Sequence, residues 1–440
     1  MALFGTDGVR GVANRDLTAE LALDLAVAAA HVLAEVGAIS KNRPKAIVGQ
    51  DSRASGEFLE AAIVAGLSSA GVDVYKVGVL PTPAIAHLVA STGADLGVMI
   101  SASHNPMPDN GIKFFAKGGG KLDDSLEAAI EGRLNEPWDR PVGKDVGRVI
   151  VDESASERYI YHLLSSLSVN LAGIKVVVDC ANGAASEVAP EVYARAGAQV
   201  IAISNQPNGL NINDNCGSTH LDNLIAQVKS SGADLGIAHD GDADRCLAID
   251  ADGNLIDGDF ILAILAKESS VPTVVGTVMT NLGFIKAMSE SGISFEKTPV
   301  GDRYVLENML AKGHKLGGEQ SGHIIMRDFA NTGDGLLTAL QLMSVMAKSK
   351  KSLAELAQVM KRFPQVLINV NDVDKSKLGT SKALAIAVNE YESKLGATGR
   401  ILLRASGTEP LVRVMVEAET QSAAEEIAQK LASLVRSELA

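Results

Sequence analysis

A serine at the end of an apolar run is the first residue in this chain that could carry out chemistry. Residues 99–106 read Met-Ile-Ser-Ala-Ser-His-Asn-Pro and overlap an apolar run, Leu96 to Ile100, that predicts a buried strand. Because Pro106 cannot continue a central strand, we expect Ser103 on a tight turn at the strand's carboxyl end. Open α/β sheets bind ligands at that edge, and a serine hydroxyl can carry a covalent group. For this segment taken alone, a turn that only satisfies its own backbone is the alternative.

Three aspartates at alternate positions predict a cation site. Residues 239–245 read His-Asp-Gly-Asp-Ala-Asp-Arg, which brings Asp240, Asp242 and Asp244 close together. Carboxylates at this spacing repel one another unless a cation lies between them, and Mg²⁺ takes such an all-oxygen ligand set. Apolar residues on both sides predict a loop between two strands rather than a solvated acidic turn. The spacing also resembles part of a calcium loop, but the downstream glutamate and flanking helices of an EF-hand are missing.

The two segments belong to an internal repeat. Residues 93–101 and 232–240 both begin Gly-Ala-Asp-Leu-Gly, and aligning them places Ser103 opposite Asp242. A weaker third copy covers residues 313–321. Repeats this far apart predict duplicated domains rather than a short-period solenoid. We therefore expect each copy to end in an equivalent loop, with the loops facing one cleft.

A segment near the C-terminus, Arg-Ala-Ser-Gly-Thr-Glu-Pro-Leu-Val-Arg, predicts a hairpin turn that binds phosphate. Arg404 and Arg413 can each form paired hydrogen bonds with phosphate oxygens. Ser406 and Thr408 offer hydroxyls, and Gly407 lets the backbone N–H groups approach an anion closely. We interpret the segment as a hairpin between two strands whose turn also holds phosphate.

A further polar segment, Gly-Glu-Gln-Ser-Gly-His at residues 318–323, lies between two apolar runs. Glu319 and Ser321 alternate onto one side, as ligands of sugar hydroxyls would. His323 taken alone is more typical of a hydrogen-bonded core histidine.

Two cations accompany the Ser103 segment. Arg10 lies in a glycine-rich turn at residues 5–11, which by itself is weak evidence for a site. Lys113 lies ten residues after Ser103 on the next expected strand, where it could neutralise a phosphate or move a proton. The alternative for Lys113 is an exposed lysine on an edge strand.

Length and periodicity predict several domains. A chain of 440 residues exceeds what one hydrophobic core usually organises. Expected strands and helices alternate along it, which indicates mostly parallel or mixed sheets covered by helices. We expect four domains, at residues 1–155, 156–255, 256–365 and 366–440. In that order they would carry the serine loop, the metal loop, the sugar loop and the phosphate turn.

Composition excludes several classes of protein. The net charge of −13 argues against nucleic acid as a partner. It also repels a phosphate ester, so local cations must dominate at short range. Three widely spaced cysteines suit a reducing cytoplasm, and the N-terminal residues do not read as a signal peptide. The most apolar helical stretch, residues 21–39, contains Asp24, His31 and Glu35, which predicts a packed helix rather than a membrane span.

Taken together, the motifs resemble the α-D-phosphohexomutase superfamily. Five of them follow in the family's order: 6–11, 99–106, 239–245, 318–323 and 404–413. Their wording is most similar to the branch that acts on glucosamine phosphates. The resemblance implies an isomerase that interconverts glucosamine 6-phosphate and glucosamine 1-phosphate, a step toward UDP-N-acetylglucosamine and the bacterial cell wall. It also implies four domains around a central cleft, three related α/β domains with mixed sheets and a smaller α+β C-terminal domain.

The resemblance further implies a role for each motif residue. Ser103 would be phosphoserine in the active form and would exchange its phosphate with a bisphosphorylated glucosamine, which is both intermediate and activator. One Mg²⁺ would be bound by Ser103, Asp240, Asp242 and Asp244. The catalytic groups around the transfer would be Ser103, His104, Lys113, Arg10 and Arg245. The substrate would be held by Glu319, Ser321, His323, Arg404, Ser406, Gly407, Thr408 and Arg413.

Two alternative functions stay open. A phosphomannomutase or phosphoglucomutase would use the same chemistry on a neutral sugar. A non-catalytic sugar-phosphate sensor would not need Ser103, Lys113 and three aspartates together, so their joint presence counts against it. For the main interpretation we expect a cytoplasmic monomer or homodimer whose partner is a small sugar phosphate, with neither nucleic acid nor membrane involved.

Overall fold

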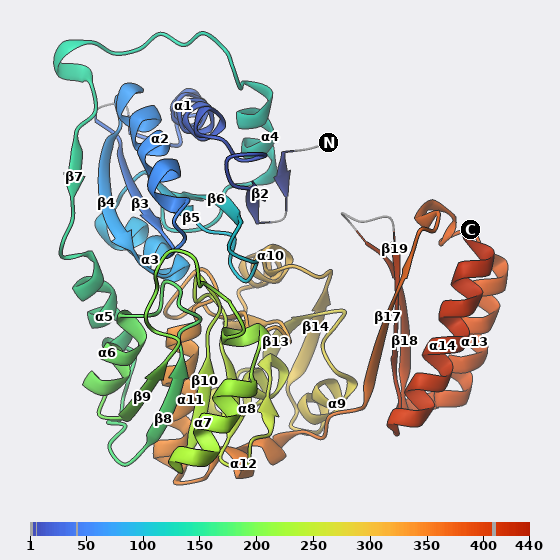
Figure 1. The fold of residues 1–440 in the computed structure, drawn as a ribbon. Helices are drawn as coiled ribbons and strands as arrows, with labels where there is room; N and C mark the ends of the chain where they lie inside the picture. Colours follow the sequence, from blue (N-terminus) through green and yellow to red (C-terminus); the bar gives the residue numbers. More distant parts are fainter. Residues whose placement is uncertain (1–2, 6, 41–42, 407–410) are drawn as a thin grey trace. The chain divides into compact units, whose positions relative to one another are not determined.

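The computed structural model describes residues 3–5, 7–40, 43–406 and 411–440. The chain divides into two compact units. The larger is Met1–Val278 with Ile293–Gln358, and the smaller is Met279–Gly292 with Val359–Ala440. Within the described residues, three sheets form in the larger unit and one in the smaller (Figure 1).

The first sheet has seven strands in the order β1-β2-β6-β5-β3-β4-β7. Its parallel part, β5-β3-β4-β7, continues through an antiparallel part, β5-β6-β2-β1. The strands are β1 (Phe4–Gly5), β2 (Gly8–Val12), β3 (Lys45–Gln50), β4 (Asp73–Val79), β5 (Leu96–Ile100), β6 (Asp109–Ala116) and β7 (Val149–Val151). The helices are α1 (Ala19–Glu35), α2 (Gly56–Ser69), α3 (Thr82–Thr92) and α4 (Asp124–Gly132). The strand expected at 96–100 is therefore confirmed.

Helices cover both faces of the first sheet, and side chains that alternate along its strands contact them. One core contains Ala46 and Val48 of β3 together with residues of α1 and α2. The opposite face is so close to α3 that a Cβ added at Gly49 would lie 2.4 Å from Ile85 Cδ1. Because successive strand residues point to opposite faces, the sheet is buried on both sides. Just before α3, the Leu80 N–H donates to the Gln50 carbonyl at 3.2 Å, so this helix begins beside the carboxyl end of β3.

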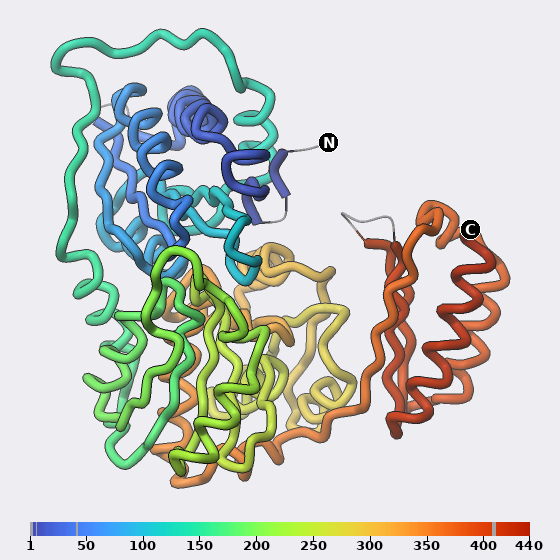
Figure 2. Tube along the Cα trace, in the orientation of Figure 1, coloured from blue at the N-terminus to red at the C-terminus, as the bar shows by residue number. Residues whose placement is uncertain are grey.

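An extended segment joins α4 to the edge strand β7. In the tube view it runs along the outside of the first sheet's helices (Figure 2). Trp138 is one of its anchors, with its ring stacked on His31 of α1 at a centroid distance of 4.3 Å. The guanidinium of Arg133 lies 4.1 Å from the same ring.

The second and third sheets repeat the mixed pattern with fewer strands. Their orders are β12-β11-β10-β8-β9 and β14-β13-β15-β16. The second contains β8 (Lys175–Asp179), β9 (Gln199–Ile203), β10 (Leu235–Ala238), β11 (Leu247–Asp250) and β12 (Leu255–Ile256), with α5 (Ala155–Ser165), α6 (Val188–Arg195) and α7 (Asp222–Ser231). The third contains β13 (Thr273–Thr277), β14 (Ser294–Thr298), β15 (Leu316–Gly318) and β16 (Ile324–Met326), with α8 (Gly258–Ser269), α10 (Asp302–Lys312), α11 (Gly335–Ser349) and α12 (Leu353–Leu356).

The three sheets share one feature that positions the polar motifs. In each, a buried strand that pairs in parallel on one side is followed by a polar loop and an antiparallel neighbour. The pairs are β5–β6, β10–β11 and β15–β16. The serine, aspartate and 319–323 motifs occupy these three loops, which is the equivalence that the internal repeat predicted.

The smaller unit is an antiparallel sheet with helices. Its strands β17 (Gln365–Asn371), β19 (Leu411–Glu417) and β18 (Arg400–Ala405) lie in that order. Helices α13 (Lys382–Leu395) and α14 (Gln421–Glu438) pack on it around a core of valines, leucines and alanines. The hairpin expected around residue 407 is present as the β18–β19 pair.

Helix α9 (Leu282–Glu290) also belongs to the smaller unit, although it lies far earlier in the sequence. Glu417 at the end of β19 is fully buried. Its carboxylate accepts hydrogen bonds from the Asn281 amide at 3.2 Å, the Leu282 N–H at 3.0 Å and the Arg400 guanidinium at 2.6 Å. One carboxylate therefore joins the start of α9 to the sheet. Within the described residues, no helix of the chain combines the length and the apolar character needed to cross a membrane.

Candidate active site

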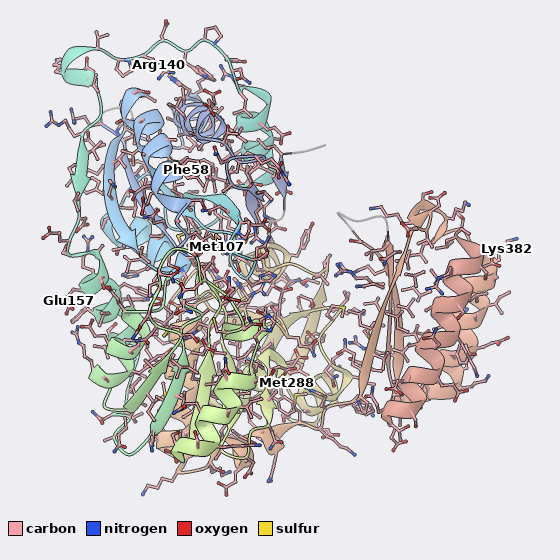
Figure 3. All side chains as sticks on the ribbon, in the orientation of Figure 1. Phe58, Met107, Arg140, Glu157, Met288 and Lys382 are labelled. Atoms are coloured by element: carbon pink, nitrogen blue, oxygen red, sulfur yellow. The ribbon has the colours of Figure 1, made fainter. Side chains whose placement is uncertain are left out.

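The Ser103 loop holds its serine in an uncommon backbone conformation. Ser103 follows β5 by three residues and has a φ of 53°, a left-handed value that few residues other than glycine adopt. Its N–H donates to Ser101 Oγ at 2.9 Å, and that hydroxyl donates to Asp51 at 2.6 Å. Such conformations persist only where the surroundings enforce them, and they gather at functional sites. Met107, labelled in Figure 3, belongs to the same loop between β5 and β6.

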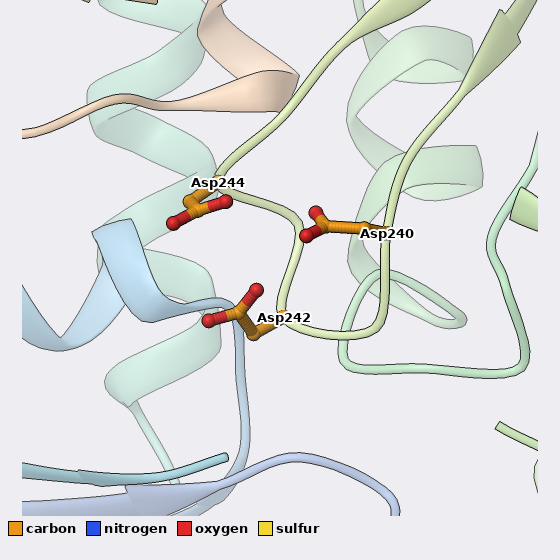
Figure 4. Close-up of side chains that lie close together, drawn as sticks. All are labelled: Asp240, Asp242 and Asp244. Carbon is orange, nitrogen blue, oxygen red and sulfur yellow. The ribbon is translucent and has the colours of Figure 1, made fainter. Parts of the chain in front are cut away.

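The three aspartates converge in the loop between β10 and β11 (Figure 4). Each of Asp240, Asp242 and Asp244 is buried, and one carboxylate oxygen of each lies within 4.8 Å of the others. Among the described residues, none donates a hydrogen bond to the buried Oδ1 atoms of these carboxylates. Buried carboxylate oxygens without donors are costly unless a cation lies between them. The donor set, oxygen only and anionic, fits a hard divalent cation.

The serine and the aspartates meet at a hydrogen bond. Ser103 Oγ donates to Asp240 Oδ2 at 2.6 Å, and Ser103 is 1% exposed. The backbone of Gly241 also lies close to that of Ser103. A Cβ added at Gly241 would be 2.5 Å from the Ser103 carbonyl oxygen. Glycine is required at position 241 for this approach. The structure thus brings the serine hydroxyl to the edge of the carboxylate cluster.

Burial and mutual repulsion shift the pKa values of the clustered aspartates. Burial, with Asp244 and Asp242 adding to it, raises the pKa of Asp240 to about 7. Burial also acts on Asp244, but His323 and Lys113 outweigh it and hold the pKa of Asp244 below its usual value. Divergent pKa values among neighbouring carboxylates are typical of functional sites.

Lys113 is a buried cation between two carboxylates. Its Nζ lies 2.8 Å from Asp242 Oδ2 and 2.8 Å from Asp7 Oδ2, and its side chain is 3% exposed. Burial would lower the pKa of Lys113, but these two carboxylates outweigh burial and raise it. Its strand, β6, lies between β2 and β5. The alternative of an exposed edge-strand lysine is therefore wrong.

A chain of alternating charges continues from Lys113 around the site. It runs through Asp242, Lys113, Asp7, Lys121, Asp302, His323 and Asp244. Lys121 Nζ lies 2.7 Å from Asp7 Oδ1 and 2.6 Å from Asp302 Oδ2. His323 lies 3.5 Å from Asp302 and 3.4 Å from Asp244. Although burial opposes it, the two carboxylates raise the pKa of His323 to about 9. Its Nε2 also accepts a hydrogen bond from the Gly333 N–H at 3.0 Å, so both ring nitrogens of His323 are tied into the site.

Three more predicted residues line the same region. Arg10 on β2 is paired with Asp7. Arg245 Nε lies 3.8 Å from Asp240 Oδ2, at the end of the aspartate loop. His104 Nδ1 lies 3.3 Å from Ser103 Oγ. Burial, with the nearby Arg245 and Arg10, lowers the pKa of His104 to about 4, so this imidazole is neutral at pH 7.

The loop between β15 and β16 adds a carboxylate. Glu319 accepts a hydrogen bond from the Gly301 N–H at 3.1 Å, at the start of α10. Burial raises the pKa of Glu319, with His323 acting in the opposite direction. Ser321 lies two residues further along, and both side chains are partly buried. The loop therefore offers Glu319 and Ser321 close in sequence to His323.

The predicted phosphate turn lies in the smaller unit. Arg404 of β18 and Arg413 of β19 are directly opposite each other in the antiparallel register. Burial and the charge of Arg413 lower the pKa of Arg404, because like charges at opposed positions repel. The Ser406 N–H donates to the Leu411 carbonyl at 2.9 Å and extends the pairing of the two strands. Gly407 and Thr408 lie outside the described residues.

Sequence reasoning missed several members of the site. Asp7 lies in the glycine-rich turn already noted, and its place three residues before Arg10 was a usable signal. Thr82, whose hydroxyl donates to Asp242 at 2.6 Å, begins α3 after a proline. Lys121 and Asp302 carried no signal, because they meet only when the first and third sheets pack together. Within the larger unit, the structure brings together Ser103, His104, Lys113, Arg10, Arg245, Asp240, Asp242, Asp244 and His323.

Comparison with protein families matches four consecutive domain descriptions to the chain. Residues 1–139, 157–253 and 257–363 match the α/β/α domains I, II and III of phosphoglucomutase/phosphomannomutase. Residues 344–434 match the C-terminal domain of the same family.

Curated relatives are similar over nearly the whole length. The chain is 62% identical to a phosphoglucosamine mutase of Streptomyces griseus subsp. griseus over 448 residues, covering 99% of each chain. It is also 62% identical to a phosphoglucosamine mutase of Streptomyces avermitilis, again covering 99% of each.

Solved structures share the fold. A phosphoglucomutase/phosphomannomutase family protein from Burkholderia thailandensis superposes with a TM-score of 0.83 at 24% identity, covering 98% of each chain. An Aspergillus fumigatus N-acetylphosphoglucosamine mutase, solved in complex with GlcNAc-6P and magnesium, superposes with a TM-score of 0.69 at 18% identity, covering 100% of this chain and 96% of that one. These likenesses and the family matches confirm the expected fold class, three related α/β domains and a smaller α+β C-terminal domain.

Proposed function

The chain belongs to the phosphoglucomutase/phosphomannomutase family, and we propose that it interconverts glucosamine 6-phosphate and glucosamine 1-phosphate. It is then an isomerase that moves a phosphoryl group between two oxygens of one sugar, on the route to UDP-N-acetylglucosamine. Identity of 62% over nearly the full length to curated phosphoglucosamine mutases supports this substrate. The observation that carries the chemistry is the 2.6 Å hydrogen bond between Ser103 Oγ and a buried, donor-poor aspartate cluster.

Ser103 is the proposed phosphoryl carrier. In the active form its Oγ bears a phosphate, and a hydroxyl of the bound sugar monophosphate attacks the phosphorus. The bond from phosphorus to Ser103 Oγ breaks and the proton of the attacking hydroxyl ends on Oγ, which leaves a free serine and a sugar with two phosphates. That bisphosphorylated sugar turns around and returns its other phosphate to Ser103. Positioning supplies much of the acceleration in such transfers, which suits a serine whose backbone is tightly held.

Asp240, Asp242 and Asp244 are the proposed ligands of one Mg²⁺, together with an oxygen on Ser103. When bound, the ion offsets negative charge on the transferring phosphoryl group. The cluster's unpaired Oδ1 atoms fit this role. The neighbouring Arg245 supplies a guanidinium on the same side of the cluster.

Lys113 and Arg10 neutralise the rest of the transferring group. Both are held by Asp7, which keeps two cations on the Ser103 side of the site. His104, neutral at pH 7, lies within reach of Ser103 Oγ and can accept or donate a hydrogen bond there.

Two further groups of residues bind the sugar. Glu319, Ser321 and His323 are proposed to hold the hexose, whose amino group carries a positive charge that suits a carboxylate. Arg404, Ser406, Gly407, Thr408 and Arg413 are proposed to hold the phosphate that is not reacting. The repulsion between the opposed arginines favours an anion at this turn. We also propose a cytoplasmic enzyme whose four domains have the boundaries 1–155, 156–255, 256–365 and 366–440.

Substitution of the carrier tests the mechanism. In Ser103→Ala we expect nearly complete loss of turnover of glucosamine 6-phosphate, with the fold kept, because a turn serine adds little packing. Intact mass of the parent, incubated with a bisphosphorylated hexose, should show one added phosphate that the variant lacks. Full turnover by Ser103→Ala would contradict the phosphoserine route. Faster turnover of glucose or mannose phosphates than of glucosamine phosphates would reject the amino-sugar assignment alone.

A further inference from the structure

The carbonyl groups of the Ser103 loop converge on one buried guanidinium. The Arg53 side chain has no exposed surface. It donates to three carbonyl oxygens, at 3.0 Å for Ser103, 2.8 Å for Asn105 and 2.7 Å for Pro106. A guanidinium presents its N–H donors in a rigid planar fork, which a lysine ammonium cannot reproduce. One side chain therefore ties down the backbone that follows the serine.

The charge of Arg53 is balanced within the same cluster. Arg53 Nε lies 3.0 Å from Asp51 Oδ2, and the Asp51 side chain is fully buried. Asp51 also accepts from Ser101 Oγ, which in turn accepts from the Ser103 N–H. The N–H of Ser103 is thus connected through Ser101 to Asp51, and its carbonyl accepts from Arg53, so both groups are linked to the same buried ion pair. Buried charges persist only when paired and hydrogen-bonded in this way.

A second side chain reaches the same carbonyl from another sheet. Asn213 lies in the segment between β9 and α7, which belongs to the second sheet. Its amide donates to the Ser103 carbonyl at 2.9 Å and to the Asn105 carbonyl at 3.1 Å. Its own N–H donates to the Ala181 carbonyl at 2.9 Å, just after β8. The Ser103 carbonyl is therefore held from the first sheet by Arg53 and from the second by Asn213.

This carbonyl lies where a small displacement would matter. It packs so closely on Gly241 that a Cβ there would approach to 2.5 Å, and the Ser103 hydroxyl lies 2.6 Å from Asp240. A shift of the Ser103 backbone would move its Oγ relative to the aspartates. Misplacement of reacting groups by about 1 Å can lower a rate on the order of a hundredfold.

We propose that Arg53 and Asn213 are positioning residues for phosphoryl transfer, which clamp the Ser103 carbonyl from two sheets and keep Oγ against the aspartate loop. Both act through the backbone carbonyl of Ser103 rather than through its hydroxyl. The clamp keeps the backbone in its left-handed conformation while the serine gains and loses a group of charge near −2. The inference rests on the proposed function, because it takes Ser103 as the carrier of the phosphate.

Asn213→Asp tests the clamp with little change in shape. Aspartate is isosteric with asparagine and tolerates the φ of 57° at this position, but it has no amide donor for the two carbonyls. The matched control is Asn215→Asp in the same segment, where φ is 51° and the amide donates to the exposed Asp214. Both variants add one carboxylate, and the one at position 213 also faces two carbonyl oxygens. A difference between them therefore reports replacement of the amide's attraction by repulsion at the Ser103 loop, and Asn213→Ala reports loss of the donor alone.

The measurement is transfer of phosphate from phosphorylated enzyme to glucosamine 6-phosphate in a single turnover, together with steady-state kcat and KM. We expect Asn213→Asp to transfer roughly ten- to a hundredfold more slowly, with KM close to that of the parent and Asn215→Asp unchanged. Amide hydrogen exchange in residues 101–107 should become faster only in Asn213→Asp. Transfer by Asn213→Asp at the rate of the control, from fully phosphorylated enzyme, would overturn the inference.

Two further measurements separate the possible failures. If the parent never gains phosphate on Ser103 by intact mass, the proposed function fails before any variant is compared. If Asn213→Asp melts before assay, Asn213→Ala and Arg53→Lys take its place. Arg53→Lys keeps the charge beside Asp51 but lacks the fork, so slower transfer at unchanged KM is again expected. If these variants transfer phosphate at the rate of the parent, the proposed positioning role of Arg53 and Asn213 is wrong.

Discussion

Replacing Lys113 by methionine should destabilise the larger unit strongly. The Lys113 side chain is 3% exposed and its Nζ lies 2.8 Å from the carboxylates of Asp242 and Asp7. Lys113→Met keeps an unbranched apolar stem of similar length but removes the charge. Asp242, whose side chain is fully buried, then loses its nearest cation. The change therefore leaves a buried carboxylate without charge compensation.

The expected cost follows from the burial of the two partners. Removing one member of a buried ion pair costs about 3–5 kcal/mol, because the other charge stays buried and unpaired. The pair with Asp7 contributes less than about 1 kcal/mol of this, since partly exposed pairs are screened by water. We therefore expect Lys113→Met to lower the free energy of unfolding by about 3–5 kcal/mol in EDTA. Added Mg²⁺ should recover part of the loss, because a cation bound by Asp242 replaces the missing charge.

The chain carries one tryptophan, Trp138, and its stacking on His31 makes urea unfolding followed by fluorescence a suitable assay. Lys117→Met is the control, because Lys117 is 60% exposed and lies 3.7 Å from Asp95. Loss of that pair should cost less than about 1 kcal/mol. If Lys113→Met costs no more than the control, the lysine does not compensate a buried carboxylate, and the charge chain around the site is wrongly described.

Three more outcomes are expected. Asp242→Asn should weaken Mg²⁺ binding measured by calorimetry, because it removes one of three ligand charges; equal affinity would count against the aspartate site. Arg413→Ala should raise KM about ten- to a hundredfold, since a charge-assisted hydrogen bond is worth about 1.5–3 kcal/mol, and released bisphosphorylated sugar should become detectable; an unchanged KM without release would reject the phosphate turn. Burial, with His162 and Arg158 adding to it, lowers the pKa of His87 to about 4, so His87 contributes stability that is complete above pH 6.5 and lost as pH falls toward 4. The parent should therefore lose about 2 kcal/mol of unfolding free energy between pH 7 and pH 4, after allowance for partial exposure. Urea unfolding of His87→Gln over the same pH range should not show this loss. Identical pH profiles of variant and parent would refute the role of His87.

Local patterns predicted the loops but not the packing between sheets. Ser103 and Asp242 could be placed because each follows an apolar run and lies before the next strand, which are features of adjacent residues. Lys113 could be placed because its strand pairs directly with the strand before Ser103, as Met99 opposite Lys113 shows. Its burial could not be predicted, since that depends on β2 covering the other side of β6.

Contacts between sheets carry no local signature. Lys121 and Asp302 belong to the first and third sheets' segments and meet only in the folded chain. Arg53 belongs to none of the sequence motifs, yet its side chain is fully buried and donates to carbonyls of another loop. Residues of this kind are found from distances and burial, whereas the hairpin that aligns Arg404 with Arg413 was predictable from two apolar runs and a glycine turn.

The buried carboxylate of Glu417 determines when the smaller unit can complete its folding during translation. The segment at Asn281 and Leu282 is synthesised long before β19. The Asn281 amide can already donate to the Phe363 carbonyl, but the carboxylate that accepts from the Leu282 N–H arrives only with Glu417. Until Glu417 is translated, the Leu282 N–H at the start of α9 lacks this acceptor, while the three sheets of the larger unit already have all their strands. Domains generally form from the N-terminus onward as synthesis proceeds. Completion of the smaller unit is therefore a late event, and a chain released before β19 lacks both the central strand of the smaller sheet and the carboxylate that joins this sheet to α9.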